Sequence, residues 1–424
     1  MNSSLAIRVQ FFFAFGFLAN FLLGCAGYKI PSLSLEDNLG SAFSIKNLKN
    51  FGSEHVYSYN DLHVYPVKFE MFHGWEQDDH VEAFKVFVKS CQKLALQDSK
   101  VILNGIGGKA QHWHKVCKQA SSVIHPSKNK NYSPDPIDTR AFFQNNFVPV
   151  FIPRDGSIPD GKSGLLTGYY EPILKGSRVR SAWYNFPIYR LPEKLKNSKT
   201  KYYSRKAIDE GALDERSLEM LYLKDPVETY FLHIQGSGII QLDDGTTVRV
   251  GYAGKNGHKY NSIGQWLIKE GYMDAKNMTA EGLKDFLRKN SYLQSTVFAH
   301  NPSYIFFRYF QFCNDFQLSQ CYADGPVGAQ GVPLVSMRSL AIDKKYYSFG
   351  MPVWLEASAP GGGNLNRLMI AQDTGSAIRG AQRADFFWGS GEVSKYPASM
   401  TREPLVLIAL VPKEGFYETA KKLP

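Results

Sequence analysis

The sequence predicts a mainly β fold that also contains helices, of the α+β class. From about residue 146 the chain consists of short apolar runs broken by Gly, Pro and Asp, which is typical of strands joined by turns. Apolar residues recur every three or four positions from Val81 to Ala95 and again within residues 261–292, which predicts helices at the front and in the middle. A length of 424 residues favours two or three domains.

The first residues have the composition of a secretory signal. Arg8 precedes an apolar run, Val9–Leu23, which is shorter than the roughly 20 residues of a membrane-spanning helix. The run ends in Leu22-Leu23-Gly24-Cys25, which resembles a bacterial lipobox and implies cleavage before Cys25 and lipid on that residue. An ordinary cleaved signal and an uncleaved anchor are the alternatives. Because Ala26 and not Asp follows the cysteine, we expect a lipid-anchored protein on the periplasmic face of the outer membrane of a Gram-negative bacterium.

Residues 1–24 would then be the signal peptide, and residues 25–65, which are polar and rich in Ser and Asn, would be a tether. The first predicted helix follows, and a second one carries Trp113, Val116 and Ala120. These two helices would form a hairpin.

Four cysteines remain beyond the lipidation site, namely Cys91, Cys117, Cys313 and Cys321. An even number in an oxidising compartment suggests two disulfides, with three possible connectivities. The economical choice pairs neighbours, which would make Cys91–Cys117 a staple for the helical hairpin. Metal binding by residues 112–117 is a weak alternative, because histidines two positions apart do not share a helix face. We therefore expect neither a metal nor a cofactor.

The candidate strands follow the pattern of apolar runs and turn residues. Asp243-Asp244-Gly245 is a turn signal between two of them, and Pro360-Gly361-Gly362-Gly363 is a hairpin loop. The predicted strands are 147–152, 165–172, 231–242, 246–250, 332–342, 352–356, 366–372 and 404–410.

The formal net charge of +10 and the pI of about 9.1 suit nucleic acid, an anionic membrane surface or an acidic polymer. The Lys and Arg residues are scattered and form no basic run, so we expect no nucleic-acid partner. The chain contains no phosphate-binding loop and no G-x-S-x-G nucleophile elbow.

Asp373-Thr374-Gly375-Ser376 matches the D-T-G-S of aspartic proteases. Those enzymes need two aspartates that share one proton, and this sequence has one D-T-G and no D-S-G. The loop also requires an apolar residue before the aspartate, where this chain has Gln372. A Gly-rich turn capped by Asp373 explains the tetrapeptide better, and a protease is a remote alternative.

Asp385 stands beside three aromatic residues in the run Arg383–Gly389. Partial burial against aromatic surface raises the pKa of a carboxyl group, and a raised pKa suits a general acid near neutral pH. The residues explain equally well the alternative that Asp385 faces solvent beside aromatic residues of the core. Gly168–Pro172, His233–Gly238 and Tyr252–Gly257 also place aromatic or polar groups beside glycines, although each of them alone is as well explained by a turn.

Taken together, the motifs resemble the membrane-bound lytic transglycosylase A family. They occur in one order over roughly residues 165–391: L-T-G-Y-Y-E-P, H-I-Q-G-S-G, Y-A-G-K-N-G, N-P-S-Y-I-F-F-R, G-V-P-L, R-S-L-A-I-D and Q-D-T-G-S-A-I-R-G followed by A-D-F-F-W-G. The resemblance implies a double-psi β-barrel interrupted by a second β-rich domain, with a groove for a glycan strand between them. The helical hairpin and barrel would take residues 66–175 and 313–415, and the inserted domain residues 176–312.

The resemblance also implies the chemistry. Asp385 would be the catalytic acid and Asp373 a nearby supporting carboxylate in cleavage of the β-1,4 bond between N-acetylmuramic acid and N-acetylglucosamine of peptidoglycan. The muramyl C6 hydroxyl would be the nucleophile, so that Asp385 acts first as acid and then as base, without a second carboxylate. Predicted substrate contacts are Tyr169, Tyr170, Glu171, Gln235, Ser237, Asn256, Phe386 and Trp388.

The chain departs from the family pattern after Gly391, where it reads Glu392–Pro397 in place of an E-A-G segment, so the loop behind the site is open to doubt. The expected partners are peptidoglycan glycan strands, the membrane through lipid on Cys25, and cell-wall synthesis enzymes. The competing function is a non-catalytic wall-binding lipoprotein or scaffold on the same barrel. Such a protein would bind peptidoglycan equally well with Asp385 changed.

Overall fold

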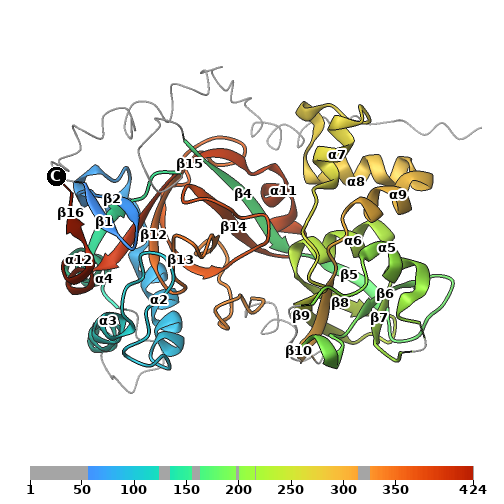
Figure 1. The fold of residues 1–424 in the computed structure, drawn as a ribbon, viewed down its shortest axis with the longest axis horizontal. Coiled ribbons are helices and arrows are strands. Elements are labelled where there is room, and N and C mark those ends of the chain that lie inside the picture. Colours follow the sequence, from blue (N-terminus) through green and yellow to red (C-terminus); the bar gives the residue numbers. More distant parts are fainter. Residues whose placement is uncertain are drawn as a thin grey trace, which may run out of the picture.

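The structure is a computed structural model in which an N-terminal helical region, a β-barrel and a second β-sheet follow one another across the molecule (Figure 1). It describes residues 56–123, 134–154, 163–196, 200–214, 216–313 and 325–423, without the side chains of 311–313. The predicted signal peptide, Cys25 and most of the predicted tether lie outside these residues.

A closed barrel forms the centre of the described part of the chain. Its strands pair in the order β12 (Pro352–Ala357), β13 (Arg367–Asp373), β11 (Ser339–Ile342), β14 (Arg383–Ser390), β4 (Gly164–Glu171) and β15 (Arg402–Pro412), and β15 pairs back with β12. The pairs β11/β13 and β14/β4 are parallel and the other neighbours are antiparallel. Closure leaves these strands without a free edge, and the inward side chains fill the barrel with a continuous apolar core.

The sheet continues outward from β15 through β3 (Phe147–Phe151), β2 (Leu62–Pro66), β1 (Tyr57–Tyr59) and β16 (Lys421–Lys422). The prediction of a tether up to residue 65 is therefore wrong at its end, because residues 57–65 belong to strands. The side chains of Leu62 and Val64 are buried in the barrel core. These strands are too short and too mixed in composition to stand out in the sequence, and pairing with distant strands decides their conformation.

The predicted helical hairpin is confirmed by α2 (His80–Leu94) and α3 (Ala110–Val123), which pack with α4 (Pro136–Asn146) beside the barrel. Asp79 is the N-cap of α2, because its carboxylate accepts the N–H of Glu82. The predicted disulfide between Cys91 and Cys117 is present and joins α2 to α3. The predicted Cys313–Cys321 bridge lies outside the described residues.

The second sheet has the order β10 (Ile305–Cys313), β9 (Thr247–Lys255), β8 (Ser237–Leu242), β5 (Ile173–Ser177), β7 (Glu219–Leu223) and β6 (Phe186–Tyr189) among the strands that the structure describes. Five α-helices of this region are described: α5 (Arg205–Ala207), α6 (Pro226–Gln235), α7 (Ile263–Lys269), α8 (Ala280–Lys289) and α9 (Gln294–His300). The mixed architecture and the barrel confirm the predicted fold class. The predicted domain boundaries stay a prediction.

The first half of the predicted strand 231–242 is wrong, because residues up to Gln235 form the helix α6. Asp225 caps this helix through the N–H groups of Val227 and Glu228, and Pro226 occupies its first turn. Gly236 ends it in the left-handed conformation, and β8 starts at the next residue.

One further boundary differs from the prediction, because β11 covers only the end of the predicted strand 332–342. The predicted helical segment 261–292 contains the two separate helices α7 and α8. Two short helices, α11 (Glu392–Met400) and α12 (Lys413–Thr419), follow β14 and β15.

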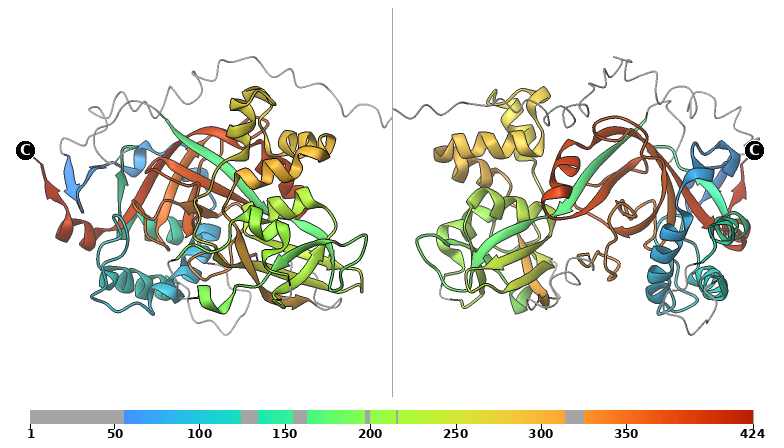
Figure 2. Two further views of the ribbon diagram at one scale, coloured as in Figure 1. Left: turned by 45° about the vertical axis from the view of Figure 1, so that its right-hand side comes forward. Right: turned by 180° about the vertical axis from the view of Figure 1, so that it is seen from behind.

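β4 connects the two bodies, as both views in Figure 2 show. It starts in the barrel, and after Pro172 the chain enters the second sheet as β5. Beside this crossing, the guanidinium of Arg249 on β9 lies 2.9 Å from Glu171 Oε1 and donates to Oε2 at 3.1 Å. Ser390 on β14 donates to the same carboxylate at 2.6 Å. A buried ion pair therefore joins the barrel to the second sheet.

In the described ranges, no helix is both long enough and apolar enough to cross a membrane.

Candidate active site

The barrel places Asp373 and Asp385 on either side of one strand. Ala341 of β11 is paired with Asp373 at the end of β13 and with Asp385 on β14. The two aspartates are therefore two strand spacings apart, which is about 10 Å between their Cα atoms. The sequence places them twelve positions apart, and the barrel makes them near neighbours across β11.

Asp385 is held by a relay of hydrogen bonds from its own strand and from β4. Thr167, its partner in the β14/β4 register, donates its hydroxyl to Asp385 Oδ1 at 2.7 Å. Arg383 Nη2 in turn donates to the Thr167 hydroxyl oxygen at 2.8 Å. Because a guanidinium can only donate, the single hydroxyl hydrogen of Thr167 must point to Asp385.

This relay distinguishes the two oxygens of Asp385. Oδ1 accepts from Thr167, so a proton on the carboxyl group belongs on Oδ2. The Asp385 side chain is only partly buried, which leaves it accessible to a ligand. The arrangement therefore offers one defined oxygen as proton donor.

The pKa of Asp385 is raised above its ordinary value. Burial is the largest cause, and the charge of Arg383 and the hydrogen bond from Thr167 oppose it. The direction of this shift favours the protonated form that a general acid requires.

Asp373 has a different set of donors. Tyr169 donates its hydroxyl to Oδ2 at 3.0 Å, and the Ala329 N–H donates to Oδ1 at 3.0 Å. Burial nevertheless raises the pKa of Asp373 to about 6, with a smaller contribution from the charge of Asp385. Both oxygens are therefore occupied by donors, and Asp373 is mostly ionised at neutral pH.

Tyr169 remains a neutral donor in this site. Its pKa is raised well above the ordinary value, first by burial and then by the negative charges of Asp373 and Asp385. Its ring packs against Phe387 with 5.2 Å between the ring centres. Thr167, Tyr169, Asp385 and Phe387 thus share one face of the β4/β14 pair.

The prediction that Phe386 contacts substrate is wrong. Successive side chains of a strand point to opposite faces, and Phe386 is fully buried in the barrel core behind Asp385. Phe387 is the aromatic residue on the Asp385 face. The alternation of strand residues is the signal in the sequence that distinguishes the two.

The predictions for Glu171 and Asn256 as direct substrate contacts are also wrong, because neither side chain is exposed. Glu171 forms the ion pair that joins the two bodies. Asn256 donates to the carbonyls of Tyr203 and Pro302 and accepts the N–H of Tyr304, so it fixes loops of the second sheet.

The other predicted contacts lie where the two bodies meet. The Gln235 side chain accepts the N–H of Tyr170, which connects the end of α6 to β4, and Ser237 begins β8 two residues later. Trp388 Nε1 donates to the Thr401 hydroxyl at 2.9 Å. This contact lies on the face of β4 that is opposite to the Thr167 side chain. Gly168 makes room for it, since a Cβ there would lie 2.7 Å from Trp388 Nε1. Ligand contact by Tyr170, Gln235, Ser237 and Trp388 stays a prediction.

Sequence reasoning missed Thr167, Arg383 and Ala329. Thr167 and Arg383 stand inside quoted motifs, and their positions two residues before Tyr169 and Asp385 place them on the same strand faces. Ala329 lies in a loop far from Asp373 in sequence and contributes a backbone N–H, for which residue type carries no signal.

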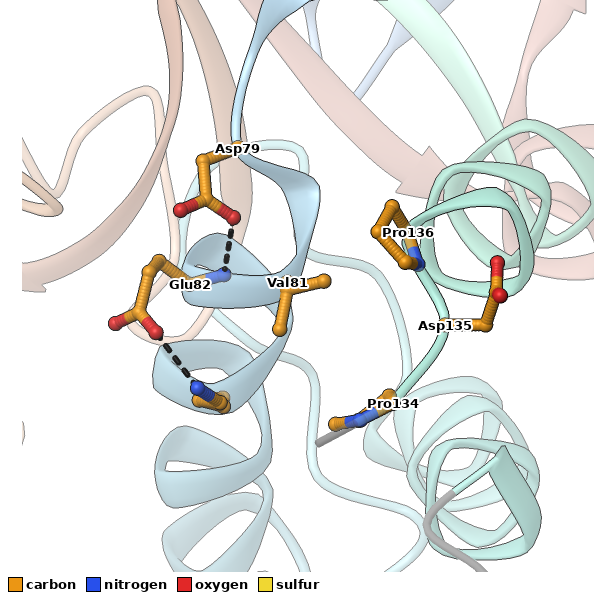
Figure 3. Close-up of a pocket in the computed structure, with 7 residues that line it drawn as sticks. Asp79, Val81, Glu82, Pro134, Asp135 and Pro136 are labelled. Atoms are coloured by element: carbon orange, nitrogen blue, oxygen red, sulfur yellow. Dashed lines mark hydrogen bonds and ion pairs between the residues drawn. The ribbon is translucent and has the colours of Figure 1, made fainter. Parts of the chain in front are cut away.

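A hollow at the other end of the molecule offers no comparable chemistry. Figure 3 shows Asp79 and Glu82 at the start of α2 opposite Asp135 at the start of α4. Asp79 and Asp135 cap their own helices, and Glu82 pairs with Lys85. Over the residues that the structure describes, no group of three or more His, Cys, Asp or Glu side chains is arranged to hold a metal ion.

Comparisons with known proteins bear on the family of the chain. Residues 165–308 match the MltA specific insert domain, and residues 338–410 match the 3D domain. The membrane-bound lytic murein transglycosylase A of Vibrio cholerae is 33% identical over 238 residues, which cover 54% of this chain and 60% of that protein. The chain thus spans about three fifths of the length of the curated relatives that it matches.

Two solved structures extend the similarity over more than four fifths of this chain. A membrane-bound lytic murein transglycosylase from Agrobacterium tumefaciens is 29% identical, with a TM-score of 0.71, 84% of this chain and 99% of that chain covered. The lytic transglycosylase LtgG of Burkholderia pseudomallei is 34% identical, with a TM-score of 0.51, 82% of this chain and 95% of that chain covered. With its insert domain, its 3D barrel and these relatives, the chain belongs to the membrane-bound lytic murein transglycosylase A family.

Proposed function

We propose that the protein is a lytic transglycosylase that cleaves the β-1,4 bond between N-acetylmuramic acid and N-acetylglucosamine of peptidoglycan and forms 1,6-anhydro-muramyl ends. The observation that carries the proposal is the relay from Arg383 through Thr167 to Asp385 Oδ1. It leaves Oδ2 as the position for a proton on a carboxyl group whose pKa burial raises. Family membership supports the same substrate.

The reaction requires one proton donor that later becomes a base. Protonated Asp385 gives its proton to the glycosidic oxygen, and the bond between that oxygen and the muramyl C1 breaks. The muramyl O6 then bonds to C1, and the Asp385 carboxylate takes the proton from O6, which restores the starting protonation state. Because the nucleophile is part of the substrate, no water needs activation and the entropic cost of a second reactant is absent.

Asp373 acts as a support in this scheme and not as a second base. Its two oxygens already accept from Tyr169 and Ala329. Its negative charge favours the protonated form of Asp385 and the positive charge that develops at C1 in the transition state.

The protein would act at the membrane. Glycan strands are the proposed binding partner along the face that carries Asp385, with Tyr169, Gln235 and Ser237 as contacts. The lipobox predicts lipid on Cys25 and a position on the periplasmic face of the outer membrane. Incorporation of radiolabelled palmitate into the wild type, and none into Cys25→Ser, is the expected result.

The decisive test is digestion of purified murein by the wild type and by Asp385→Asn, with the products identified by mass. We expect anhydro-muropeptides from the wild type and at least about a thousandfold less from the variant, since the proposed proton donor is lost. Reducing-end sugars from the wild type would mean hydrolysis. Equal rates would remove Asp385 from the reaction, and equal binding with no cleavage by either protein would favour the non-catalytic scaffold.

A further inference from the structure

A pocket of about 470 Å³ lies where the barrel meets the second sheet, and it is called the seam pocket below. Its wall is formed by the end of β4, by β5, by the end of β7, by the first turn of α6 and by the start of α11. Tyr170 and Ile173 supply apolar surface, and Lys175 and Lys224 stand at the rim. Both bodies therefore contribute to one site.

The seam pocket is on the other face of β4 from Asp385. Tyr169 donates to Asp373 and packs on Phe387, so it lies on the face of Asp385. Tyr170 is the next residue of the strand, and its side chain points to the opposite face, where it lines the pocket. A ligand in the seam pocket is thus separated by the strand from the bond-cleaving site.

The rim lysines carry charge that no carboxylate balances. The Lys224 N–H donates to the Lys175 carbonyl at 3.3 Å, so the two side chains start from adjacent backbone. Lys175 Nζ donates to the neutral amide oxygen of Gln241 at 2.8 Å, and Lys224 Nζ lies 5.7 Å from the centre of the Trp183 ring. In the described part of the chain, neither lysine forms an ion pair with a carboxylate.

The acidic residues of the same wall do not offset this charge. Asp225 is paired with Arg288, and Glu228 is paired with both Arg288 and Lys284. Glu392, the third acidic residue of the wall, is paired with Lys395. The Lys284 side chain is buried, so its charge needs Glu228. The seam pocket therefore combines an apolar wall with a pair of cations that can accept a carboxylate.

We propose that the seam pocket binds a short peptide that carries carboxylates, namely the stem peptide of peptidoglycan. Its carboxylates would lie against Lys175 and Lys224, and its small methyl side chains against Tyr170 and Ile173. The volume lies in the range of pockets for small ligands. The proposal rests on the proposed function, which places the protein among strands that carry acidic peptides.

Calorimetric titration of the purified protein with the tripeptide L-alanyl-γ-D-glutamyl-meso-diaminopimelate tests the site. We expect binding by the wild type and an affinity about tenfold or more lower in Lys175→Glu/Lys224→Glu. The matched control is Lys68→Glu/Lys100→Glu, which changes the net charge equally at exposed lysines far from the pocket. Ile173→Trp fills the pocket without changing charge and should also weaken binding. Trialanine, which lacks the side-chain carboxylate, should bind more weakly than the tripeptide.

No heat with the wild type, or equal affinities in the wild type and the charge-reversed variant, would overturn the proposal. Addition of an N-acetylglucosamine hexamer should leave tripeptide binding unchanged, and displacement would make the pocket part of the glycan site. Murein digestion is measured separately. A protein that binds the tripeptide but forms no anhydro product contradicts only the proposed function. A protein that forms the product but does not bind the tripeptide contradicts only this inference.

Discussion

At the level of single residues, Asp385 and Asp373 differ in what their oxygens contact. Thr167 occupies one oxygen of Asp385 and leaves the other free for a proton, whereas Tyr169 and Ala329 occupy both oxygens of Asp373. The two carboxylates therefore have different tasks, although burial raises the pKa of each. The following two substitutions shift the pKa of Asp385 in opposite directions.

Thr167→Val removes the hydroxyl while it keeps the shape of the side chain. We expect kcat to fall about tenfold to a hundredfold with little change in KM, because Asp385 loses its orienting bond. The lost hydrogen bond lowers the pKa of Asp385 in the wild type, so its loss raises that pKa and moves the alkaline limb of the pH–rate profile to higher pH. Thr167→Ser should restore both properties. An unchanged profile in Thr167→Val would contradict a positioning role.

Asp373→Asn should move the same limb to lower pH. The charges of the two aspartates interact, and the interaction is shared by the pair, so removal of the Asp373 charge lowers the pKa of Asp385. Initial rates of murein cleavage, measured over the pH range in which both limbs of the profile are visible, check the direction of this shift. An unchanged limb would mean that Asp373 carries no charge in the active enzyme.

At the level of elements, β4 has a separate function on each face. Thr167, Tyr169 and Glu171 point to the face with Asp385 and the ion pair to β9, whereas Gly168 and Tyr170 face α11 and the seam pocket. Gly168 is a position of this strand that has no room for a side chain.

Gly168→Ala should destabilise the protein by about 1–3 kcal/mol, measured by urea unfolding. The new methyl group would lie under 3.0 Å from Trp388 Nε1, the Ala398 carbonyl and the Thr401 hydroxyl, two of which form a hydrogen bond to each other. Gly375→Ala is the control, because a Cβ there meets Ile378 at 3.4 Å, an ordinary contact. Equal free energies of unfolding in the two variants would mean that Trp388 and α11 can move away from the new methyl group without loss of stability.

At the level of the whole molecule, the buried pair Glu171–Arg249 connects the barrel to the second sheet. Arg249→Met should destabilise the protein by about 3–5 kcal/mol at pH 7, because Glu171 is left as a buried, unpaired charge. Burial raises the pKa of Glu171, and without Arg249 nothing of comparable strength opposes it. The stability that comes with protonation is present at low pH and is lost as pH rises through the raised pKa. The stability of the variant should therefore approach that of the wild type as pH falls from 7 through this raised pKa.

Thermal unfolding of both proteins across this pH range measures the difference. The control is Arg178→Met, which removes an exposed arginine paired with Asp244 and should change stability by less than about 0.5 kcal/mol. A pH-independent loss in Arg249→Met would mean that packing of the arginine side chain, and not its charge, holds the two bodies together.

The sequence alone predicted the helical hairpin, its Cys91–Cys117 bridge and most strands of the barrel. These features depend on local periodicity, turn residues and spacing, which a single chain displays directly. It did not determine β1 and β2, the helix α6 before β8, or which aromatic residue shares the face of Asp385.

Only the tertiary structure decided those points. Asp373 and Asp385 become neighbours because β11 lies between their strands, and Thr167, far away in sequence, becomes the partner of Asp385 because β4 runs parallel to β14. Glu171 and Asn256 are of residue types that often bind ligands, but both are buried here. Glu171 is paired with Arg249, and Asn256 donates to loop carbonyls, so both residues stabilise the fold. The physical reason is that strand pairing and burial depend on residues far apart in the chain, whereas helical periodicity and turns depend on neighbours.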